Sequence, residues 1–86
     1  PPPPPTISDR ATVHPDADLG EGVGVGAGAV IGAGARLGSG CRIGPGCVVG
    51  EGVVVGENAL LHANVTLYPG VRVGARTILH SGVVLG

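Results

Sequence analysis

The sequence lacks the residues from which most small cores are built. It contains no Phe, Trp, Met or Lys, and Tyr68 is its only aromatic residue. Its 18 Gly and 8 Pro are typical of disordered or collagen-like chains. The chain is nevertheless 43% hydrophobic, and a disordered segment lacks that much Val, Ile, Leu and Ala. The glycines must therefore serve a repeated geometry rather than disorder.

Charge, hydrophobic runs and cysteines exclude several classes of protein. A net charge of −1 offers no basic patch, so we expect no nucleic-acid partner. No apolar run approaches the roughly 18 residues of a membrane span, and no signal-peptide pattern occurs. Cys41 and Cys47 are too few to make a disulfide framework, and we expect both to be reduced, buried core residues.

A six-residue repeat runs through the chain without an insertion or a slip. Stepping by six gives an unbroken aliphatic series: Ile7, Val13, Leu19, Val25, Ile31, Leu37, Ile43, Val49, Val55, Leu61, Leu67, Val73, Leu79 and Leu85. If these residues hold place one of each hexad, place five is always small (Ala, Val, Cys or Thr). Such self-similarity is the signature of a solenoid.

Places three and four of the hexads predict a turn. Every proline after Pro5 falls at place three, and place four is mostly Gly or Asn. Pro followed by Gly is typical of a type II turn, whose third residue needs a positive φ. We therefore expect a positive φ at the following residues: Gly22, Gly28, Gly34, Gly40, Gly46, Gly52, Asn58, Asn64, Gly70 and Gly82. Asp16 tolerates this conformation, whereas Arg10 and Arg76 adopt it at some cost.

Each hexad is therefore a short strand and a turn. Alternation along the strand points places five and one inward and places six and two outward. Three strands per coil make a triangular prism with 18 residues per coil, and coils stack about 4.8 Å apart. The sequence predicts an all-β, parallel β-helix of about four coils, with an axial column of aliphatic side chains as its core.

Arranging the sequence in rows of 18 residues, one coil to a row, separates three outer faces. The valine face carries Val30, Val48, Thr66 and Val84, with Tyr68. The histidine face carries Arg42, Leu60 and Ile78, with His62 and His80. The charged face carries Asp18, Arg36, Val54 and Arg72. Because exposed apolar stripes usually mark interfaces, we expect the valine and histidine faces to pack on other copies and the charged residues to stay in water.

Three side chains are candidates for a subunit interface or the edge of a cleft: His62, His80 and Tyr68. The two histidines hold the same place one coil apart, so their side chains should stack. They either line a cleft between subunits or simply fill an interface. His14 lies in the first coils and is interpreted as a surface residue.

No residue is assigned to catalysis, a cofactor or a metal. The histidine spacings of 48 and 18 do not match the close pair with which γ-class carbonic anhydrases bind zinc. The glycine-rich residues 20–34 contain no G-x-G-x-x-G, and the absence of Lys excludes a P-loop. The acidic residues Glu21, Glu51 and Glu57 all hold the solvated third place of their turns.

The final quarter carries a more specific resemblance. The segments LHANVTLYPGV (61–71) and ILHSGVVLG (78–86) closely resemble the UDP-3-O-(3-hydroxyacyl)glucosamine N-acyltransferases of lipid A biosynthesis. This likeness to hexapeptide-repeat acyltransferases implies a left-handed β-helix. It also implies a cytoplasmic homotrimer without a cofactor, which transfers a 3-hydroxyacyl group from acyl carrier protein to the amine of a UDP-linked glucosamine.

The resemblance also suggests how the chain is organised. Residues 1–6 look like a proline-rich linker from a missing N-terminal uridine-binding domain, and residues 7–86 like the first part of a β-helix truncated at its C-terminal end. The family's general-base histidine lies in a later coil, and none of the three histidines here matches it. We therefore expect an enzyme whose 86-residue piece is inactive alone.

Two other functions stay open. The chain could belong to another hexapeptide-repeat enzyme, either the O-acyltransferase of the same pathway or a sugar-nucleotide acetyltransferase. It could also be a scaffold prism without catalysis. The residues that follow Gly86 in the gene would separate the enzymes, and an assay of the full-length protein would test the scaffold.

Overall fold

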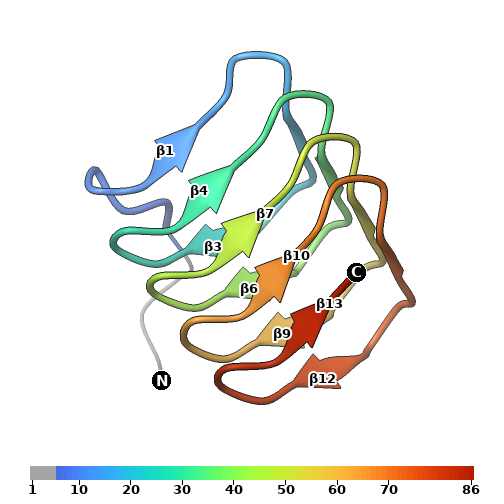
Figure 1. The fold of residues 1–86 in the computed structure, drawn as a ribbon. Coiled ribbons are helices and arrows are strands. Elements are labelled where there is room, and N and C mark those ends of the chain that lie inside the picture. Colours follow the sequence, from blue (N-terminus) through green and yellow to red (C-terminus); the bar gives the residue numbers. More distant parts are fainter. Residues whose placement is uncertain (1–5) are drawn as a thin grey trace.

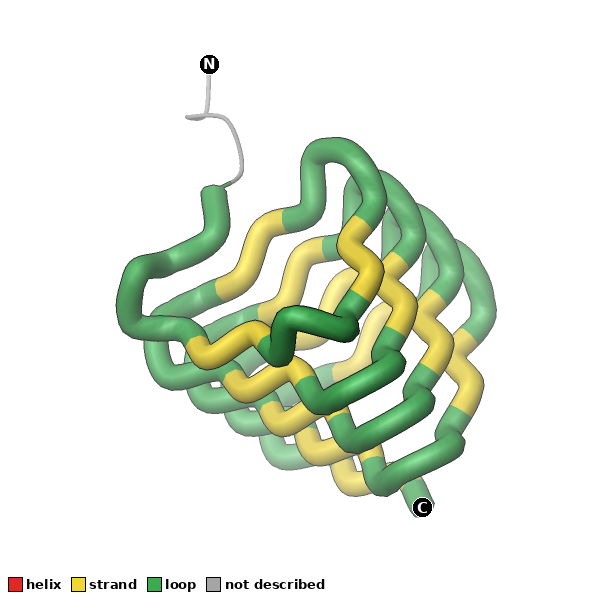
Figure 2. The backbone as a smooth tube through the Cα atoms, turned by 90° about the horizontal axis from the view of Figure 1, so that it is seen from above, coloured by secondary structure: helices red, strands yellow, loops and turns green. Residues whose placement is uncertain are grey.

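The computed structural model describes residues 6–86. They form a parallel β-helix of strands and turns and contain no α-helix (Figure 1). Of the predicted linker, residues 1–6, the first five lie outside the described residues. Thirteen two-residue strands alternate with turns, and seen from above they form stacked coils with strands on the sides and turns at the corners (Figure 2). The predicted all-β solenoid of about four coils is confirmed.

The strands form three parallel sheets, one on each side of the coils. The valine-face sheet contains β1 (Thr12–Val13), β4 (Val30–Ile31), β7 (Val48–Val49), β10 (Thr66–Leu67) and β13 (Val84–Leu85). The charged-face sheet contains β2 (Asp18–Leu19), β5 (Arg36–Leu37), β8 (Val54–Val55) and β11 (Arg72–Val73). The histidine-face sheet contains β3 (Gly24–Val25), β6 (Arg42–Ile43), β9 (Leu60–Leu61) and β12 (Ile78–Leu79).

The pairing register has the predicted period. Val13 pairs with Ile31 and Arg72 with Val54, so each strand lies against the strand one coil away. Every place-one side chain therefore stacks on another place-one side chain. This register places the aliphatic series in one column.

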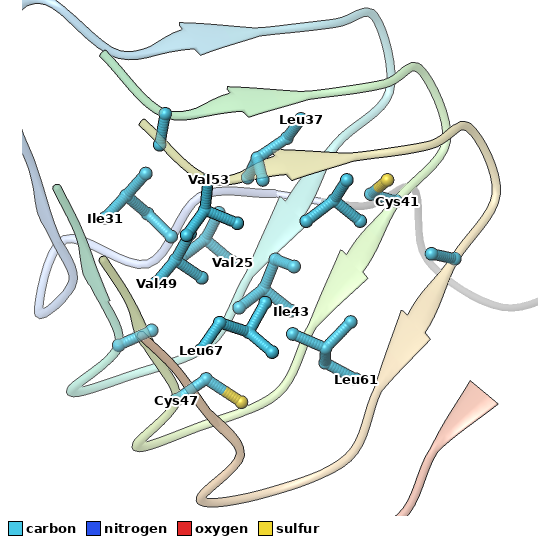
Figure 3. Packing of buried hydrophobic residues seen from close by; sticks show 14 of the residues in the cluster. Val25, Ile31, Leu37, Cys41, Ile43, Cys47, Val49, Val53, Leu61 and Leu67 are labelled. Atoms are coloured by element: carbon cyan, nitrogen blue, oxygen red, sulfur yellow. The ribbon is translucent and has the colours of Figure 1, made fainter. Parts of the chain in front are cut away.

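The core is a column of small and branched aliphatic side chains (Figure 3). Ile31, Leu61 and Leu67 are at most 1% exposed, and Cys41 and Cys47 are fully buried beside them at the corners. None of the buried residues in the described range is polar or charged. The interior therefore needs no aromatic residue, because the small place-five side chains fill the space between the stacked place-one residues.

The turns adopt the predicted conformation, and their hydrogen bonds show what this conformation does. All ten expected Gly and Asn residues have a positive φ. In the later coils the N–H of place four donates to the place-three carbonyl one coil earlier, as from Asn64 to Pro45 O (3.0 Å) and from Gly70 to Glu51 O (2.9 Å). The positive φ aims this turn peptide along the prism axis, so the corners are hydrogen-bonded from coil to coil as the strands are.

Two of the expected left-handed residues are exceptions. Asp16 and Arg10 are not among the residues with a positive φ, contrary to the sequence prediction. Their N–H groups donate to side chains within their own turns, at 3.0 Å to His14 Nδ1 and at 3.1 Å to Ser8 Oγ. No described coil precedes these turns, so there is no earlier turn peptide to which the N–H could donate.

Arg76 is a non-glycine, non-asparagine residue held at φ 61°. The left-handed conformation costs such a residue about 1–2 kcal/mol. We expect Arg76→Gly to raise the free energy of unfolding by about 1 kcal/mol in urea titrations, after the greater flexibility of glycine in the unfolded chain is subtracted. Arg72→Gly, at the exposed position of strand β11, is the matched control and should lower the free energy of unfolding. Equal effects of the two changes would contradict this account of the turn.

Candidate functional site

The histidine face combines a hollow surface with polar side chains. A groove of about 700 Å³ runs across β3, β6 and β9. Its floor includes Gly24, Gly26 and Gly44, which have no side chain to fill it. Arg42, Leu60 and His62 stand around this floor, and a volume of this size suits a small organic ligand.

The two candidate histidines lie together as expected. His62 follows β9 and His80 follows β12, and their rings stack with centroids 5.4 Å apart and planes 4° from parallel. Both side chains are exposed. The 18-residue coil places the two histidines in register, because each directly follows a strand and Leu61 pairs with Leu79.

Tyr68 lies on another face. It follows β10 on the valine face, is 55% exposed, and lines a second, smaller groove of about 410 Å³ with Val30, Val48 and Thr66. The third candidate is therefore not brought to the histidines within one chain. Val30, Val48 and Val84 are 40–59% exposed beside it, so the predicted apolar stripe is present on the surface.

His14 takes part in a local turn. Its Nδ1 accepts the N–H of Asp16 at 3.0 Å and lies 4.0 Å from the Asp16 carboxylate. The interpretation of His14 as a surface residue agrees with this geometry.

Arg42 lines the groove, although the sequence analysis did not select it as a candidate site residue. It projects from β6 and is exposed, and its guanidinium Nη1 donates to the carbonyl of Gly22 at 3.1 Å. When the sequence is arranged in rows of 18 residues, Arg42 lies beside Gly24 and Gly44, and this arrangement was the signal that could have revealed the groove. The signal becomes visible only when the neighbouring coils are read together, because the glycines of those coils make the groove.

Cys41 and Cys47 are free and buried, as predicted. Their S–H groups donate to the carbonyls of Gly56 and His62, each at 2.9 Å. Burial raises the pKa of both thiols above the ordinary value of 9.0. They remain protonated at neutral pH and are poor nucleophiles.

These thiols give a prediction for alkaline pH. A pKa raised by folding contributes stability that is fully present below the unfolded-state pKa and is lost as the pH rises through the higher folded value. The urea midpoint should therefore fall above about pH 9, and Cys41→Ala/Cys47→Ala should remove most of the fall. Iodoacetamide should modify both thiols slowly in the native chain and rapidly in urea. Fast native labelling would show that the corners open.

Within residues 6–86, no group of three or more His, Cys, Asp or Glu side chains is placed to hold a metal ion. The same residues include no helix that is long and apolar enough to cross a membrane.

Comparison with known proteins places the chain among transferases. Residues 22–57 and 52–86 match the family described as bacterial transferase hexapeptide (six repeats). Perosamine N-acetyltransferase from Caulobacter crescentus, solved with CoA and GDP-perosamine, is 36% identical over 93% of this chain, with a TM-score of 0.77. This likeness confirms the predicted left-handed β-helix.

A second solved structure is more distant in sequence. The UDP-N-acetylglucosamine acyltransferase LpxA from Bacteroides fragilis is 26% identical over 94% of this chain, with a TM-score of 0.71. The match covers 47% of the Caulobacter enzyme and 46% of LpxA, so the chain spans about half the length of each. A search of curated proteins gives no match.

Proposed function

Because this chain belongs to the hexapeptide-repeat family of bacterial transferases, we propose that it is part of an N-acyltransferase acting on a nucleotide-linked amino sugar. The donor is a 3-hydroxyacyl group on acyl carrier protein, and the acceptor is the amine of a UDP-linked 3-O-acyl-glucosamine in lipid A biosynthesis. The observation that carries this proposal is the family match over residues 22–86 together with the specific segments 61–71 and 78–86.

Both solved relatives support a nucleotide-linked sugar as the acceptor, and the Caulobacter enzyme also supports an amine as the acceptor group. One binds GDP-perosamine, a nucleotide-linked amino sugar, and the other is an acyltransferase for UDP-N-acetylglucosamine. In the proposed reaction the acceptor nitrogen attacks the thioester carbonyl, the C–S bond breaks, and an amide C–N bond forms. The carrier thiol leaves, and the amine loses a proton to a general base.

The proposal assigns that base to a coil outside residues 1–86. His62 and His80 match no catalytic motif, and the buried thiols are unsuited to carry an acyl group. We propose a longer, cytoplasmic enzyme in which residues 7–86 form the first part of the β-helix. Three copies would pack through the valine and histidine faces, because those faces expose Val48, Val84 and Ile78 at 41%, 59% and 56%.

A second candidate is a sugar-nucleotide N-acetyltransferase that uses acetyl-CoA. It is favoured by the higher identity to the Caulobacter enzyme, 36% against 26% for LpxA. The two candidates share an acceptor class and differ in the donor. Donor choice therefore separates them.

The test uses the natural full-length protein with UDP-3-O-(3-hydroxyacyl)glucosamine. One reaction receives 3-hydroxyacyl-acyl carrier protein and the other acetyl-CoA, and mass spectrometry identifies the product. We expect a gain of one 3-hydroxyacyl group with the carrier-protein donor and no acetylation. Acetylation alone would favour the second candidate, and no transfer to any nucleotide-linked amino sugar would contradict both.

A further inference from the structure

One edge of the prism is free of charge over most of its length. The turns that join β3 to β4, β6 to β7, β9 to β10 and β12 to β13 stack along it, and we call it the histidine–valine edge (Figure 1). From residue 27 onward its corner residues are all uncharged: Ala27, Gly28, Pro45, Gly46, Ala63, Asn64, Ser81 and Gly82. The other two edges carry Glu51 and Arg76 among their corner residues. Another protein surface can therefore cover the histidine–valine edge without burying an unpaired charge.

Apolar and imidazole side chains flank this edge on both sides. Val30, Val48 and Val84 hold place six, the first outward place after the edge, and are 40%, 41% and 59% exposed. His62 and His80 hold place two, the last outward place before the edge, and their stacked rings are exposed. On the charged face, by contrast, no large hydrophobic residue of the described strands is exposed. This distribution is typical of an interface.

The two histidines hold a place at which the coil period favours glycine. At Gly26 and Gly38, which also hold place two, a Cβ would lie 2.6 Å from a backbone nitrogen of the next coil. His62 keeps its side chain although another coil follows it, since the Gly82 N–H donates to Ala63 O at 3.2 Å. Packing within the chain does not require these exposed rings, whereas a contact outside the chain would use them.

The two sides of the edge match each other in level and size. Place two of the histidine face and place six of the valine face are four residues apart in the sequence, so they lie at nearly the same height along the prism. When three such edges face a threefold axis, the valine side of each copy meets the histidine side of the next at equal height. The residues brought opposite each other are Gly26 and Val30, Gly44 and Val48, His62 and Thr66, and His80 and Val84. Valine thus meets glycine in the earlier coils, and a threonine hydroxyl can donate to an imidazole in a later one.

We propose that three copies pack with their histidine–valine edges around a common axis, and that His62 and His80 of one copy contact Thr66 and Val84 of the next. The number of copies rests on the proposed function, whereas the choice of edge rests on its charges and side chains. Because the prism is triangular, the valine and histidine faces diverge away from the axis. Tyr68, at the far side of the valine face, then lies at the mouth of the gap between two copies.

The first test is a disulfide between copies of the natural full-length protein, freed of its own cysteines. His62→Cys and Thr66→Cys are introduced together, the protein is mildly oxidised, and a non-reducing gel is run. We expect covalent trimers that a reductant dissolves, because the two sulfurs can join only where the side chains of neighbouring copies touch. Tyr68→Cys with Arg72→Cys is the matched control, since this pair holds the same two places at the next edge. Trimers from the control pair and none from the first pair would overturn the choice of edge.

The second test is the size of the full-length protein in solution, measured by light scattering. Val48→Lys would bury a charge beside the axis and should weaken association about 100-fold or more, so that monomers replace trimers. Val54→Lys, at place six of the charged face, should leave the trimer intact. Circular dichroism checks that both variants keep the fold. A trimer that withstands Val48→Lys, or an unmodified protein that is a monomer, would contradict the proposal.

Failure of this inference and failure of the proposed function give different results. If the full-length protein acylates an amino-sugar nucleotide but cross-links through another edge, the edge assignment is wrong and the function stands. If the pair at positions 62 and 66 cross-links into trimers but no acyl group is transferred from either donor, the edge assignment stands and the proposed function is wrong.

Discussion

Gly56→Ala is expected to destabilise the prism by about 3 kcal/mol, close to the upper end for an overpacked core. A Cβ at Gly56 would collide with the backbone of the next coil, lying 2.7 Å from Ala75 Cα and 2.8 Å from Gly74 C. Backbone atoms of a hydrogen-bonded turn cannot rotate away as a side chain can. The coil spacing would have to increase locally, and urea unfolding measured by circular dichroism should report the loss.

Gly52→Ala is the matched control for this clash. Gly52 has a φ of +67°, and a Cβ there meets nothing within 4 Å. Alanine should therefore cost only the left-handed strain, about 1 kcal/mol. If Gly52→Ala were as damaging as Gly56→Ala, backbone conformation and not coil-to-coil contact would explain the place-two glycines.

Leu61→Ala is the second change with a large expected effect. Leu61 is fully buried and is stacked between Ile43 and Leu79 in the axial column. Its truncation should cost about 3 kcal/mol, from lost burial and from a cavity that the neighbouring coils cannot close. A domain of this length has a total stability of about 4–13 kcal/mol, so the urea midpoint should fall by a large fraction.

Leu85→Ala provides the comparison at the same place of the hexad. Leu85 is only partly buried, and β13 pairs with β10 on one side alone. Its truncation should cost about 1 kcal/mol, because little of the side chain leaves a packed site. Similar losses at Leu61 and Leu85 would show that the column is not the main source of stability.

Much of the fold could be predicted from the sequence because one period governs it. The series from Ile7 to Leu85 fixes the register, and the place-four residues fix the corners, so the sheets and the φ signs follow together. Asp16 and Arg10 departed from the pattern, and their N–H groups donate to side chains within their own turns, His14 Nδ1 and Ser8 Oγ. The hexad pattern describes the backbone turn and does not include such bonds to side chains.

The candidate site was less predictable for a related reason. The stacking of His62 on His80 follows from the 18-residue coil and was confirmed. The groove at Arg42 depends on missing side chains in two neighbouring coils, and a residue-by-residue search for chemistry does not look for missing side chains. Packing between subunits depends on surfaces outside one chain, so the placement of Tyr68 and the histidines at an interface stays a prediction.

The central claim is that the prism belongs to an enzyme that forms an amide on a nucleotide-linked amino sugar. The most direct measurement is the position of the new acyl group after reaction of the full-length protein with 3-hydroxyacyl-acyl carrier protein. An amide on the sugar nitrogen survives mild hydroxylamine, and tandem mass spectrometry should place it on the glucosamine amine. Because the acceptor already carries a 3-O-acyl ester, the donor's acyl group is isotopically labelled, and loss of this labelled group from a sugar oxygen in hydroxylamine would contradict the claim and point to an O-acyltransferase.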